Sequence, residues 1–65
     1  ERTIDNLING NLSDAKTLAK GVSFTLLEHT AREAGMSSVR ATKAAVYLTC
    51  RESDRQDAFQ AYCNA

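Results

Sequence analysis

Residues 37–51, SSVRATKAAVYLTCR, contain the side chains best suited to bind a partner. In an α-helix the side-chain period is 3.6 residues, which places one set on a single narrow face: Arg40, Lys43, Ala44, Tyr47 and Arg51. We call this set the basic–tyrosine face. Tyr and Arg are frequent anchors of protein interfaces, so the set predicts a surface that engages a protein partner. A tyrosine that simply lies along the helix with its hydroxyl in water would have the same spacing.

A helix-turn-helix is the alternative interpretation of this region. Ala31 lies four residues before Gly35, and two serines then precede the next helix, which is the spacing of that motif. In such a motif the second helix enters the major groove, and the DNA contacts would come from Lys20, Arg40, Lys43 and Arg51. Two helices joined at an angle show the same spacing without binding DNA. The net charge of zero also weighs against DNA, because phosphate neutralisation supplies most non-specific affinity.

The remaining polar side chains do not form a catalytic pattern. His29 is the single histidine and lies among charged neighbours, with no acid pair or nucleophile at a catalytic spacing. Together with Cys50 and Cys63 it makes three zinc-type ligands at no recognised spacing. We therefore expect no enzyme activity, no metal and no cofactor, and two reduced thiols.

Length and composition limit the number of domains, the kinds of partner and the location that we expect. A chain of 65 residues makes one domain, 1–65, with a small core, so a homodimer would add to its stability. The eight basic and eight acidic residues are unevenly spread, because residues 15–51 carry six basic and two acidic ones. No apolar run approaches the roughly 20 residues that span a bilayer, and no signal pattern begins the chain, so we expect a cytoplasmic protein without a membrane partner.

The spacing of apolar residues, serines and glycines predicts an all-α fold, a compact bundle of about five short helices with the helix-turn-helix-like pair in the middle. The expected helices are 4–9, 14–20, 24–34, a fourth that reaches residue 51, and a fifth after Ser53. Thr3, Ser13, Ser23, Ser37 or Ser38, and Ser53 are the expected caps, and Gly10, Gly21 and Gly35 the expected ends. The predicted core is Ile4, Leu7, Ile8, Leu12, Leu18, Val22, Phe24, Leu27, Ala31, Val39, Val46, Cys50, Phe59 and Tyr62.

Four segments resemble a group of short uncharacterised proteins encoded by bacteriophages and conjugative plasmids. They are residues 10–16 (GNLSDAK), 18–20 (LAK), 45–48 (AVYL) and 59–65 (FQAYCNA). The resemblance implies a bacterial cytoplasmic setting and an accessory role in a mobile element, and supplies no catalytic or binding residues. Gly21 and Val22 depart from it, since such proteins tend to be more basic there.

Overall fold

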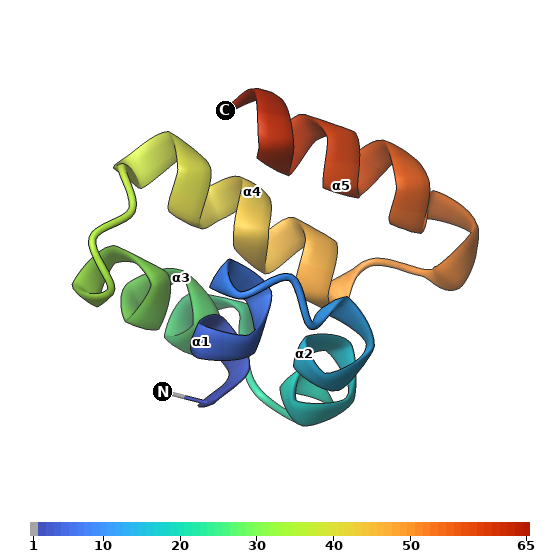
Figure 1. Ribbon diagram of the computed structural model, residues 1–65, viewed down its shortest axis with the longest axis horizontal. Coiled ribbons are helices and arrows are strands. Elements are labelled where there is room, and N and C mark those ends of the chain that lie inside the picture. Colours follow the sequence, from blue (N-terminus) through green and yellow to red (C-terminus); the bar gives the residue numbers. More distant parts are fainter. Residues whose placement is uncertain (1) are drawn as a thin grey trace.

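The computed structural model describes residues 2–65, which form five α-helices and one turn of 3₁₀-helix without strands (Figure 1). The elements are α1 (Arg2–Ile8), α2 (Leu12–Ala19), α3 (Phe24–Glu33), α4 (Ser38–Thr49), η1 (Glu52–Asp54) and α5 (Arg55–Asn64). The prediction of a small all-α bundle is confirmed. No helix within the described residues is both long and apolar enough to cross a membrane.

The first two helices begin differently from the prediction. Thr3 does not cap α1, because it lies inside that helix and is buried. Ser13 lies inside α2, whose N-cap is Asn11 without a side-chain cap bond. Gly10, with φ +85°, supplies the turn between α1 and α2, a backbone conformation that glycine adopts at little cost. The local turn was therefore predictable, whereas the first residue of each helix was not.

The α3–α4 pair forms as the capping signals predict. The hydroxyl of Ser23 accepts a bond from the amide of Leu26, and the hydroxyl of Ser37 accepts one from the amide of Arg40, both at 3.2 Å. Between the helices, Gly35 has φ +103°. After this turn the two helices run in broadly opposite directions side by side (Figure 1).

The C-terminal part departs further from the prediction. Helix α4 ends at Thr49 rather than at residue 51, because Cys50 is extended with ψ 164°. Ser53, the expected cap of the fifth helix, lies within η1, and the N-cap of α5 is Asp54 without a side-chain cap bond. This 3₁₀ turn lets α5 fold back along α4 (Figure 1).

Helix α4 is the centre of the bundle and packs against α3, α5 and α2. Alanines make this close packing possible, and the core contains Ile4, Leu7, Ala15, Ala19, Leu27, Ala31, Ala41, Ala44, Ala45, Tyr47, Leu48, Ala58 and Tyr62. The prediction was right for Ile4, Leu7, Leu27, Ala31 and Tyr62, and Leu12, Val22, Cys50 and Phe59 are partly buried against this core. It was wrong for five large residues that are exposed, namely Ile8, Leu18, Phe24, Val39 and Val46. Small alanines thus took the interior positions that volume alone would give to valine and leucine.

Candidate functional site

The predicted basic–tyrosine face does not exist as a surface. Tyr47 is 2% exposed and Ala44 is fully buried. The ring of Tyr47 packs against Phe59 of α5, with ring centres 5.3 Å apart, so the returning helix covers this side of α4. The aromatic residue of the predicted interface, Tyr47, is therefore part of the core.

The basic residues of that face also separate. Arg40 is half-buried, and its guanidinium lies 4.7 Å from the centre of the Tyr62 ring, where a cation–π contact holds it against α5. Arg51 lies beyond the end of α4, in the exposed segment before η1. Of the charged side chains of that face, Lys43 alone projects from α4 itself into solvent. These cations consequently do not form one patch.

A different sector of α4 faces solvent. Val39, Lys43 and Val46 follow each other at helical spacing, and the two valines are 61% and 40% exposed. We call these three residues the α4 outer face. The predictions failed here because α4 has apolar residues on more than one side, with valines on one and alanines on others, so its periodicity does not select the buried side.

The neighbouring side of α3 extends this surface. The Thr42 hydroxyl donates to the Glu28 carboxylate at 2.6 Å, which fixes the register of α3 against α4. Phe24 lies one turn before Glu28, and Val46 lies one turn after Thr42. Because the helices run in opposite directions, both apolar side chains lie toward the same end of this seam. Phe24, at 40% exposed, therefore flanks the α4 outer face.

The predicted DNA contacts divide between the two ends of α4. Lys20 follows α2 as its C-cap and lines a hollow beside the C-terminal end of α4, whereas Arg40 is near the N-terminal end of α4. Lys43 is exposed on α4, the second helix of the helix-turn-helix-like pair. The carboxylate of Glu28 accepts a hydrogen bond from Thr42 of the same helix, which brings a negative charge to this surface. The four residues therefore do not form one continuous basic surface.

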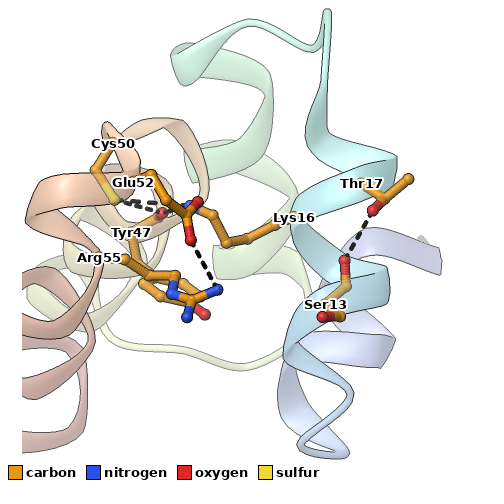
Figure 2. A network of polar contacts seen from close by, with 7 residues as sticks. All are labelled: Ser13, Lys16, Thr17, Tyr47, Cys50, Glu52 and Arg55. Carbon is orange, nitrogen blue, oxygen red and sulfur yellow. Dashed lines mark hydrogen bonds and ion pairs between the residues drawn. The ribbon is translucent and has the colours of Figure 1, made fainter.

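Lys16 binds the C-terminal end of α4, a contact that the sequence did not predict (Figure 2). Its ammonium donates to the carbonyl of Tyr47 at 2.9 Å and lies 3.6 Å from the sulfur of Cys50 and 4.8 Å from the centre of the Tyr47 ring. The Cys50 thiol donates to the same carbonyl at 3.1 Å. Lys16 thus satisfies a carbonyl in the last turn of α4, where the helix dipole favours a cation. The 31-residue separation of the partners leaves no sequence signal for this contact.

The pKa of Tyr47 is also shifted from its usual value. Burial raises the pKa of its hydroxyl above the usual value, and the charge of Arg55 opposes this in part. Cys50 and Glu52 act in the same direction as burial. The neutral hydroxyl is therefore the form that the folded chain favours.

The histidine and the thiols form no catalytic or metal-binding cluster within the described residues. His29 and Glu33 lie 3.1 Å apart, one turn apart on the solvent side of α3. Both cysteines are free thiols, and no three His, Cys, Asp or Glu side chains of residues 2–65 come close enough to hold a metal ion.

Comparison with known proteins adds no relative. No protein-family model, curated protein or solved structure matches this chain. The resemblance to phage and plasmid proteins therefore remains a prediction.

Proposed function

We propose that this protein is a non-enzymatic binding module that engages a protein partner through the α4 outer face, extended by Phe24. The observation that carries the proposal is the exposure of Val39 and Val46 on the helix that otherwise forms the centre of the core. This surface replaces the basic–tyrosine face, whose tyrosine is buried.

Val39 and Val46 lower the stability of α4 relative to alanine unless their side chains are buried. A β-branched residue lowers helix propensity by roughly 0.5 kcal/mol relative to alanine, and burial normally offsets that loss. Val39 is 61% exposed and Val46 is 40% exposed, so the isolated chain gains only part of the free energy that full burial of their methyl groups would give. A partner that buries both valines and Phe24 would recover that free energy.

The charges around these residues indicate what kind of partner fits. Lys43 lies between the valines on the helix surface, and the neighbouring Glu28 is bonded to Thr42. An amphipathic helix with apolar residues along one side and a carboxylate opposite Lys43 has the complementary chemistry. A small core of this kind also gains stability from such an association.

Affinity capture with paired variants tests the proposal. The bait is the whole chain, with Val39→Ser/Val46→Ser as the test variant and Ile8→Ser/Leu18→Ser as the matched control, because Ile8 and Leu18 are exposed apolar residues outside this surface. We expect a partner that binds the wild type and the control and is lost from the test variant, with both variants folded by circular dichroism. Equal retention by the two variants would reject the α4 outer face.

DNA binding is the second candidate function, supported by the Gly35 turn and the exposed Lys43 on the second helix. It predicts retention of the chain on duplex DNA that falls steeply with salt and is weakened by Lys43→Gln. Capture of the protein partner after nuclease treatment, with no salt-dependent DNA retention, would exclude this candidate.

A further inference from the structure

The molecule has a groove whose lining residues do not include those of the α4 outer face. One hollow of about 520 Å³ lies between α2, the end of α4 and η1, and another of about 530 Å³ lies between α2 and α5. The two hollows share the residues Ser13, Glu52 and Arg55, so they adjoin each other at the Glu52–Arg55 ion pair, and we treat them together as one groove. Each has the volume of a small-molecule site.

The first hollow concentrates positive charge. Lys16, Lys20 and Arg55 line it, and Glu52 is its single acidic residue. The chain as a whole has no net charge, so this hollow is a local excess of cations. Such a concave positive site attracts anions.

Two of the three cations, Arg55 and Lys20, retain donors for a ligand. Arg55 pairs with Glu52 through one nitrogen at 3.0 Å, and both side chains are largely exposed, which makes the pair weak. A guanidinium has five N–H donors, so Arg55 has others to offer. Lys20 makes no ion pair within residues 2–65 and is exposed at the rim. Lys16 uses its ammonium to cover the carbonyl end of α4, which offsets the partial negative charge of that helix end (Figure 2).

The second hollow supplies a different chemistry. Leu12, Tyr47 and Phe59 line it together with Gln56. The Tyr47 and Phe59 rings are tilted at 54° to each other, and Phe59 is partly buried. Because Tyr47 is 2% exposed, Phe59 supplies the accessible aromatic surface of this hollow, against which an apolar, flat group fits.

We propose that this groove binds a phosphate monoester, with the phosphate between Lys20 and Arg55 and its flat apolar part against Phe59. The planar fork of arginine matches two phosphate oxygens, and lysine adds a point charge. Ser13 lines both hollows, and its hydroxyl is a further donor for the phosphate or its ester oxygen. This site is separate from the α4 outer face.

Nuclear magnetic resonance titration of the whole chain with phenyl phosphate tests the proposal, with sodium chloride at matched ionic strength as the reference. We expect saturable shifts of backbone amides in residues 12–22 and 49–59. Arg55→Gln and Lys20→Gln should each weaken binding by about tenfold, the value of one charged hydrogen bond. Lys43→Gln removes the same charge from the α4 outer face and should leave binding unchanged.

Separate titrations with inorganic phosphate and with phenol test the two halves of the groove one at a time. We expect phosphate to shift the amides beside Lys20 and Arg55, and phenol those beside Phe59. Absence of saturable shifts with phenyl phosphate, or equal weakening by Lys43→Gln and Lys20→Gln, would overturn the proposal. Because Val39 and Val46 lie outside the groove, such a result would leave the test of the α4 outer face unaffected.

Discussion

Lys16 and Tyr47 form a contact that joins α2 to α4 across 31 residues of sequence. The ammonium donates to the Tyr47 carbonyl at 2.9 Å and at the same time lies 4.8 Å from the centre of the Tyr47 ring. One side chain therefore closes the last turn of the central helix and covers its largest buried ring. The contact links the end of α4 to a helix with which it has few other contacts.

Lys16→Met should destabilise the fold, because it keeps the apolar stem but removes the charge. We expect the free energy of unfolding to fall by about 1–2 kcal/mol from the lost charged hydrogen bond and cation–π contact. Urea denaturation followed by circular dichroism measures the change. Lys43→Met, at an exposed position of α4, is the control and should change stability by less than about 0.5 kcal/mol. Equal losses in the two variants would contradict a special role for Lys16.

The Thr42–Glu28 hydrogen bond should contribute to the docking of α3 on α4. Thr42→Val keeps the shape and removes the donor, so we expect a loss of about 1 kcal/mol in the free energy of unfolding. Glu28→Gln keeps an acceptor oxygen and should cost less. A double-mutant cycle in urea isolates the pair, and a coupling energy near zero would show that the contact adds no stability.

Replacing Gly35 by any L-residue should lower the stability of the fold, although there is space for a side chain there. An added Cβ would meet no atom within 4 Å, so the cost of Gly35→Ala comes from φ +103° alone. We expect a loss of about 1 kcal/mol or more, measured as a lower urea midpoint. A D-alanine placed there by chemical synthesis favours positive φ and should stabilise the chain relative to L-alanine. The opposite order would contradict the backbone argument.

The raised pKa of Tyr47 predicts a loss of stability in alkali. Because the folded-state pKa lies above that of the unfolded chain, the hydroxyl contributes stability below pH about 10, and this contribution is lost as the pH rises through the folded-state pKa. Tyr47→Phe lacks the ionising group, so its free energy of unfolding should fall less between pH about 8 and about 11. Urea denaturation of both proteins at the two pH values measures the difference. Parallel losses would show that other groups cause the alkaline instability.

The sequence by itself determined the elements of this fold whose signals are local. The Ser23 and Ser37 caps and the Gly35 turn depend on residues a few positions apart, and each is formed as its sequence predicts. Such interactions stabilise one helix end or one turn irrespective of what packs against it. They were sufficient to predict an all-α bundle and its central helix pair.

Only the tertiary structure decided which side of α4 faces inward. Val39 and Val46 are larger than Ala44 and were expected inside, yet α3 and α5 approach α4 over its alanines and leave the valines exposed. The physical reason is that α4 has apolar residues on more than one side, so the buried sector is set by the shapes of the helices that cover it. The same packing buried Tyr47 and brought Lys16 to its carbonyl, and neither contact has a periodicity that a sequence can display.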